Sequence, residues 1–309
     1  MPFYFEKISS TQLESLSREK TAFFFPVGPL EDHGPHLPMG LDLLEAERVA
    51  LLSAEKTEKE MDGWTVIIMP KAPLGIDSAT SKIAITVRGH VLRDWLVDAC
   101  LGLSRAGFSH FVCFSGNAGP KQLTAIEEAG KVLRQRSRKF GVPRLWGKKY
   151  SHPTLVSASS ACIEKAEAST SPFWPSPPEH GGERDTSVAL AISPDLVDKM
   201  AAGLPDQERE GTFLERFIRH NKHTISGYWG APSQARAARG DMILDEKVNQ
   251  IFPKLRAVWE GANPEKLFRS WFSIYPSNKS FFKAWLLAIA LTVLMSIWVF
   301  SNFTGFLKD

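Results

Sequence analysis

Short apolar segments alternate with amphipathic ones along the first half of this chain, and this alternation constrains the fold most. Thr11-Gln12-Leu13-Glu14 has capping-box spacing and predicts a short helix before the first strand. Strands are then expected at 21–28, 64–69 and 110–114, and helices at about 43–59, 90–106 and 121–134. Such alternation is typical of βαβ units. We therefore predict an α/β fold, a mostly parallel central sheet with helices on both faces, with functional residues where strands end.

The composition is that of an ordinary globular protein. The 309 residues are 43% hydrophobic and 23% charged, which suits one large domain or two small ones. The 37 basic and 34 acidic residues give a formal net charge of +3 and are dispersed, so no basic face indicates nucleic acid. Cys100, Cys113 and Cys162 are too few for a disulfide framework or a cysteine-rich zinc site, which favours a reducing compartment.

The C-terminal segment is the most apolar part of the sequence. No charged residue occurs from Ala284 to Leu307, and aromatic residues flank this segment on both sides. About 20 apolar residues are enough to cross a bilayer, so the segment predicts a transmembrane helix. The alternative is a buried C-terminal helix of the globular domain.

The charges around this segment predict its orientation. Lys266, Arg269, Lys279 and Lys283 precede it and only Lys308 follows it, so the large domain is expected on the cytoplasmic side. The N-terminus does not have the pattern of a signal peptide. We therefore predict a single-pass tail anchor, with an α/β domain at 1–262, a connector at 263–282 and the membrane helix at 283–307.

A polar loop directly follows the first predicted strand. Residues 31–42 (EDHGPHLPMGLD) hold two histidines and three carboxylates within twelve positions. Imidazole and carboxylate together suit zinc, manganese or iron, and a Gly- and Pro-rich loop can turn Glu31, His33 and Asp42 toward one point. The alternative is a polar loop whose histidines bond to backbone carbonyls.

A second unusual segment, residues 169–182, is rich in proline, serine and glycine and contains Trp174. It runs straight into a polar cluster at 179–185 (EHGGERD). We interpret it as a long functional loop or lid, with a plain surface linker as the alternative.

Three segments resemble the creatininase family. The first is the loop at 31–42, which is similar to the family's strand followed by Glu-x-His-Gly-x-His-Leu-Pro-x-x-x-Asp. The second, residues 179–187 (EHGGERDTS), resembles His-Ala-Gly-x-x-Glu-Thr-Ser with Asp185 in place of the glutamate. The third, residues 226–240, is similar to the family's Gly-rich turn and the helix after it. The resemblance covers roughly residues 10 to 260.

This resemblance implies a layered α/β fold, a homo-oligomer, and one or two divalent metals that hydrolyse a C–N bond of a cyclic or simple amide. Glu31, His33 and Asp42 match metal ligands, with Asp42 as the bridge. His180, with Glu179 beside it, matches the position that shuttles protons. For Trp174, a cover over the substrate and a residue that merely packs the loop are both open.

The chain also departs from the family pattern. Where the family has a metal-ligating histidine, the segment 115–120 (SGNAGP) carries Asn117, which is a poor ligand for zinc. Lys82-Ile83-Ala84 replaces a Pro-Gly-Thr turn. Glu183 could substitute as a ligand or be a solvated loop carboxylate.

Two main hypotheses follow. The first is a membrane-tethered, metal-dependent amidohydrolase that acts on a small amide, with zinc as the first candidate ion and manganese or iron as alternatives. The second is a pseudoenzyme that keeps the fold as a membrane-anchored binding or scaffolding module. A metal enzyme of another reaction class, such as a lactonase or deformylase, is a third reading.

Overall fold

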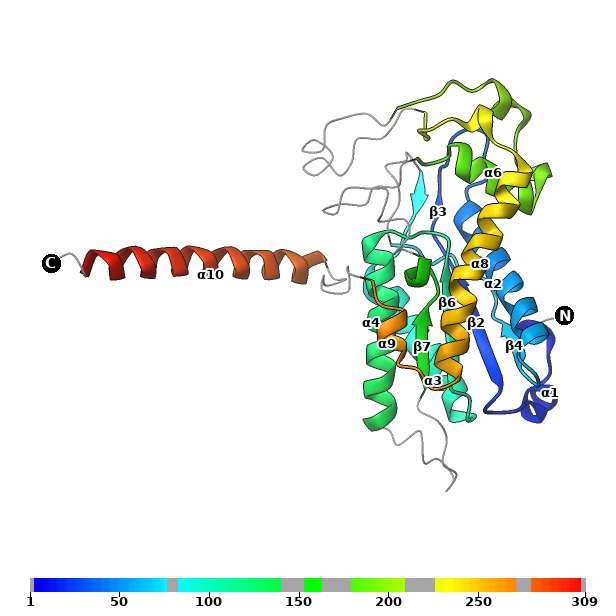
Figure 1. Ribbon diagram of the computed structural model, residues 1–309, viewed down its shortest axis with the longest axis horizontal. Helices are drawn as coiled ribbons and strands as arrows, with labels where there is room; N and C mark the ends of the chain where they lie inside the picture. Colours follow the sequence, from blue (N-terminus) through cyan, green and yellow to red (C-terminus); the bar gives the residue numbers. More distant parts are fainter. Residues whose placement is uncertain are drawn as a thin grey trace.

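Five parallel strands form the central sheet of the protein (Figure 1). The structure is a computed structural model that describes residues 3–76, 83–139, 153–162, 179–208, 226–270 and 279–306. The strand order is β1 (Phe3–Tyr4), β4 (Thr65–Ile68), β2 (Thr21–Val27), β6 (His110–Ser115) and β7 (Thr154–Ser157). Every neighbouring pair is parallel, so the predicted mostly parallel sheet is confirmed.

Helices cover both faces of the sheet because the side chains of β2 alternate between two apolar clusters. Phe24 packs with residues of α2 (Leu41–Glu60), α6 (Glu183–Ile192) and α8 (Ala237–Trp259). Phe23 and Phe25 pack on the other face with α3 (Gly89–Arg105) and α4 (Pro120–Lys139). All three phenylalanines are fully buried, and each contributes about 1.5–3 kcal/mol through burial. β2 is therefore the centre of a three-layer α/β/α domain.

The N-terminal helix α1 (Ser10–Ser15) is present, but its predicted cap is wrong. The capping box is formed by Ser9 and Gln12 rather than by Thr11 and Glu14. The Gln12 amide N–H donates to Ser9 Oγ at 3.2 Å, and the Ser9 N–H donates to Gln12 Oε1 at 2.8 Å. The short helix η1 (Phe5–Lys7) ends just before Ser9, whose extended backbone frees its side chain for capping.

Shorter elements surround the carboxyl edge of the sheet. A two-stranded antiparallel ribbon pairs β3 (Leu30–Glu31), which follows β2, with β5 (Ala84–Ile85). Single helical turns complete the domain at η3 (Ser159–Cys162), η5 (Pro194–Leu196), η6 (Lys199–Gly203), η7 (Pro232–Gln234) and α9 (Pro264–Leu267). Because β2 and β6 are parallel neighbours, the loops after both strands meet at this edge.

The C-terminal helix α10 (Lys279–Phe306) stands apart from the α/β domain in Figure 1. Its side chains are described for residues 285–301, and the large apolar ones from Leu286 to Phe300 are exposed, from 43% at Ile289 to 72% at Phe300. Among the described residues, no helix is both long enough and apolar enough to cross a membrane. Most of the predicted lid, including Trp174, lies outside the described residues.

Candidate metal centre

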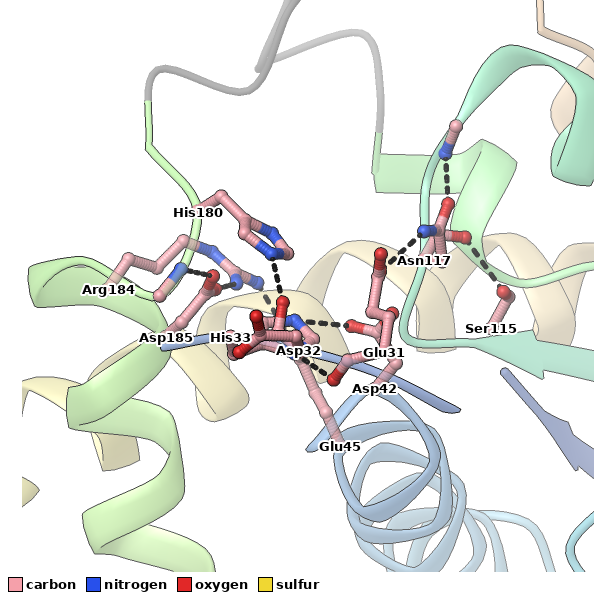
Figure 2. A network of polar contacts seen from close by, with 12 residues as sticks. Glu31, Asp32, His33, Asp42, Glu45, Ser115, Asn117, His180, Arg184 and Asp185 are labelled. Carbon is pink, nitrogen blue, oxygen red and sulfur yellow. Dashed lines mark hydrogen bonds and ion pairs between the residues drawn. The ribbon is translucent and has the colours of Figure 1, made fainter. Parts of the chain in front are cut away.

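Four buried side chains converge at the carboxyl edge of the sheet. Glu31 ends β3, His33 follows it, Asp42 lies in the first turn of α2, and His180 precedes α6. Ligand atoms of Glu31, His33 and His180 all lie within 4.8 Å of one another. His33 Nε2 lies 3.6 Å from Asp42 Oδ1 (Figure 2). The structure thus brings together the three predicted metal ligands and adds His180 to them.

The loop after β2 holds these groups through its backbone. The Glu31 N–H donates to Met39 O at 2.9 Å, and the Asp32 N–H donates to Ile83 O at 3.1 Å. The Gly34 N–H donates to Asp32 Oδ1 at 2.8 Å, which closes a tight turn between Glu31 and His36. Ile83-Ala84 therefore contacts the loop directly through backbone hydrogen bonds. This segment is one of the departures from the family pattern.

His180 is fixed by contacts of both its backbone and its ring. Its backbone pairs with Trp229 through hydrogen bonds of 3.0 and 2.8 Å. Its ring stacks on His33, with ring centres 4.3 Å apart, and lies 4.9 Å from the Trp229 ring. Its Nε2 lies 2.8 Å from Asp32 O. Because a carbonyl oxygen only accepts, Nε2 carries the proton and Nδ1 keeps its lone pair.

Trp229 was missed as a site residue, although its segment was noted for family resemblance. Its contribution depends on strand-like pairing with His180, for which the sequence carries no local signal. Gly181 lets the turn after His180 approach the backbone of His33 closely. Its φ is 61°, and a Cβ there would lie 2.2 Å from His33 O, so only glycine fits.

The electrostatics of the centre favour positive charge. Burial lowers the pKa of His33, but the hydrogen bond and charge of Asp42 outweigh burial and raise that pKa to about 10. Burial raises the pKa of Asp42, but His33 outweighs it and the net direction is downward. Asp42 Oδ2 is buried and accepts no hydrogen bond from the described residues. A carboxylate oxygen left bare beside an imidazole and a second carboxylate suits a divalent cation.

The pKa of His180 shifts in the opposite direction from that of His33. Burial, and next the positive charge of His33, lower its pKa. The ring is therefore neutral at pH 7 and offers its Nδ1 lone pair to a cation or a proton.

Asn117 lies within the centre, as predicted. Its Nδ2 lies 3.3 Å from Glu31 Oε1 and donates to it, while its Oδ1 accepts the Gly119 N–H at 2.7 Å. Asn117 thus faces a predicted ligand with a hydrogen-bond donor rather than with an acceptor.

The other predicted residues have different surroundings. The Glu179 carboxylate accepts a hydrogen bond from the Arg184 N–H in the first turn of α6, where it complements the helix dipole. Burial, and next the charge of Asp185, raise the Glu179 pKa. Glu183 is 35% exposed in its side chain, lies 3.9 Å from Arg239, and is not part of the ligand cluster.

A charged network beneath the centre was missed by sequence reasoning. Arg184 donates to Asp185 at 2.6 Å and to Glu45 at 2.9 Å, and Lys247 also contacts Glu45. Asp185 in turn accepts the Gly181 N–H at 2.8 Å and so supports the turn that carries His180. Burial would raise the pKa of Asp185, but Arg184 outweighs it and holds that pKa at about 2. Arg184 and Glu45 are 139 positions apart, so no sequence pattern links them.

Comparison with known proteins identifies a family that matches most of the chain. The model of the creatininase (creatinine amidohydrolase) family matches residues 6–255. A mycofactocin precursor peptide peptidase of Mycolicibacterium smegmatis is 27% identical over 248 residues, which cover 75% of this chain and 83% of that protein. Its counterpart in Mycobacterium ulcerans is 26% identical over 251 residues, which cover 76% of this chain and 84% of that protein.

Solved structures of the same fold include creatininases. One described as manganese creatininase superposes with a TM-score of 0.62 at 20% identity, covering 84% of this chain and 99% of the other. A creatininase variant described as the Zn-Zn type gives 0.62 at 20% identity with the same coverage. A putative creatinine amidohydrolase of Bacteroides fragilis gives 0.63 at 18% identity, covering 84% of this chain and 97% of that one.

Proposed function

Since the chain belongs to the creatininase family, we propose that it is a metal-dependent hydrolase that cleaves the C–N bond of an amide. The observation that carries the proposal is the convergence of Glu31, His33 and Asp42 with the neutral ring of His180. Creatininases described with manganese and with zinc support a divalent ion, and we propose zinc or manganese for this chain.

The positions of the four buried side chains suggest which of them bind the ion and which one transfers a proton. Glu31, His33 and Asp42 would hold the ion, because they supply the imidazole and carboxylate donors that such ions prefer. When bound, a divalent ion supplies Lewis-acid activation of water and of the amide carbonyl. His180 accepts a proton at Nδ1 and returns it to the leaving nitrogen, while Asp32 O keeps the ring oriented through Nε2.

The proposed substrate is a small cyclic amide or a short peptide. The family name refers to creatinine, a cyclic amide, and the mycobacterial relatives are peptidases of a precursor peptide. Both substrate types present a neutral C–N amide bond to the same centre.

Chelation is the direct test of this function. Full-length protein in detergent is assayed against a panel of cyclic amides and short peptides before and after EDTA treatment. We expect EDTA to abolish hydrolysis and added zinc or manganese to restore it. His180→Gln should lower turnover by about 10²–10⁴-fold, because proton transfer is lost, and should retain the ion. Hydrolysis that is insensitive to EDTA would contradict the proposal.

One observation favours a second candidate function. Asn117 presents a donor where the family has a ligating histidine, as expected for a metal-free binding module. Such a module would hold no ion and hydrolyse nothing in the same assay while remaining folded.

We also propose that α10 attaches the protein to a membrane with the α/β domain on the cytoplasmic side. The exposed side chains of 286–301 lie within a longer uncharged sequence that continues to Leu307. An exposed apolar surface of this length is unfavourable in water and needs an apolar partner. Basic residues before the uncharged segment 284–307 and only Lys308 after it support the orientation.

Membrane fractionation tests this attachment. Full-length protein should stay in the pellet after carbonate extraction. Leu291→Arg with Leu294→Arg should release it, since each charge near the bilayer centre costs about 2.5–3.5 kcal/mol. The control replaces the same two residues with phenylalanine and should stay in the pellet. Full-length protein that is soluble and monodisperse without detergent would contradict the attachment.

A further inference from the structure

We infer that the centre takes a single divalent ion, and that the Asn117 amide group stands in for a second one by donating its N–H to Glu31. This inference rests on the proposed function, because it concerns the number of ions at the same centre. It is carried by the orientation of the Asn117 side chain and by one buried oxygen, Asp42 Oδ2, that accepts no hydrogen bond from the described residues.

The orientation of the Asn117 amide is fixed from both ends (Figure 2). The Gly119 N–H points at Oδ1 at 2.7 Å, so that atom must be the oxygen and the amide nitrogen must face Glu31. The Ser115 hydroxyl donates to the backbone oxygen of Asn117 at 2.7 Å. Rotating the amide would place two donors together at Gly119 and two acceptors together at Glu31.

The loop that carries Asn117 has no room to shift. A Cβ at Gly116 would lie 2.0 Å from the Asp42 backbone oxygen, so the loop is seated directly on the start of α2. Asn117 is therefore held at a fixed place relative to Asp42 as well as to Glu31.

A second ion on the Asn117 side would meet the wrong chemistry. The amide N–H carries partial positive charge, which repels a cation, and it already satisfies Glu31 Oε1 at 3.3 Å. The amide oxygen, the only atom of that side chain that could ligate, is turned away toward Gly119.

The His33 side has the complementary chemistry. Asp42 Oδ2 is buried and receives no hydrogen bond from the described residues, and Asp42 Oδ1 lies 3.6 Å from His33 Nε2. Acceptor groups that a cation can use are thus concentrated between Asp42, His33 and Glu31. One ion satisfies them, while the Asn117 amide N–H supplies partial positive charge to Glu31 Oε1.

Zinc titration of the full-length chain, followed by calorimetry and by plasma mass spectrometry, tests this count. We expect one zinc per chain for the wild type. Asn117→Asp replaces the donor with an isosteric acceptor beside Glu31, so the zinc content should rise from one to two. Asn249→Asp, an exposed site on α8 where the side chain accepts from Lys56, is the matched control and should stay at one.

The outcomes are distinct. Two zinc ions in the wild type would overturn the inference and leave the proposed function standing. No bound ion would overturn the proposed function and the inference with it. Asn117→Asp with an unchanged count of one would overturn the role given to Asn117. The wild type loaded with Mn²⁺ gives an independent measurement: an isolated-ion electron paramagnetic resonance spectrum is expected, and an exchange-coupled pair would contradict it.

Discussion

Asp42→Ala is expected to lower the zinc affinity of the protein by at least about 100-fold and to leave no measurable amide hydrolysis. Asp42 supplies the bare buried oxygen of the centre, and its other oxygen lies beside His33. Removing it takes away the carboxylate that both attracts the ion and orients the imidazole. Affinity is measured by calorimetry, and hydrolysis by the substrate panel described above.

The matched control for Asp42→Ala is Glu47→Ala. Glu47 lies on the same helix α2, pairs with Lys71 at 2.7 Å and lies outside the described ligand cluster. Glu47→Ala should keep the affinity and the activity of the wild type. If Asp42→Ala protein binds zinc with the affinity of the wild type, Asp42 is not a ligand of the ion.

Removing both cations from Glu45 should destabilise the fold by about 3–5 kcal/mol, because it leaves the buried carboxylates of Glu45 and Asp185 without a cationic partner. The Glu45 side chain is only 3% exposed and contacts Arg184 and Lys247. Burial would raise the pKa of Glu45, but these two cations outweigh it and lower that pKa. The Glu45 contribution is therefore present near pH 7 and is lost as the pH falls through the lowered pKa. The variant is Arg184→Met with Lys247→Met, measured by urea unfolding.

A triple variant separates the unpaired charge from lost packing. Adding Glu45→Met to the double variant removes the carboxylate that lost both cations and leaves only Asp185 unpaired, so we expect about 2 kcal/mol or more of stability to return. Lys71→Met, which breaks the solvent-accessible pair with Glu47 of α2, should change stability by less than about 1 kcal/mol. A triple variant no more stable than the double would show that the charge of Glu45 is not the cause.

The sequence predicted the layered α/β fold because β2, β4 and β6 are apolar runs between amphipathic helices. The strand order was out of reach, since β1 has only two residues and no pattern that assigns it to the β4 edge. The N-cap of α1 was misplaced because several polar residues lie near the helix start, and only the backbone of Ser9 decides which one caps it.

At the centre, the sequence identified the residues better than their orientations. Glu31, His33, Asp42 and His180 could be singled out from the spacing of two sequence motifs, and the structure brings them together. Glu179 is adjacent to His180 in sequence, yet its carboxylate bonds to the start of α6. Asn117 was recognised as a missing histidine, but the direction of its amide depends on the Gly119 N–H. Such contacts depend on the path of the backbone, which residue spacing does not specify.

The single measurement that most directly tests this account is the metal content of the full-length protein, purified without added metal or chelator. We expect about one zinc or manganese ion per chain, bound by Glu31, His33 and Asp42, and its loss in Asp42→Ala. A folded, metal-free protein that takes up no ion when zinc or manganese is supplied would contradict it and favour the binding module instead.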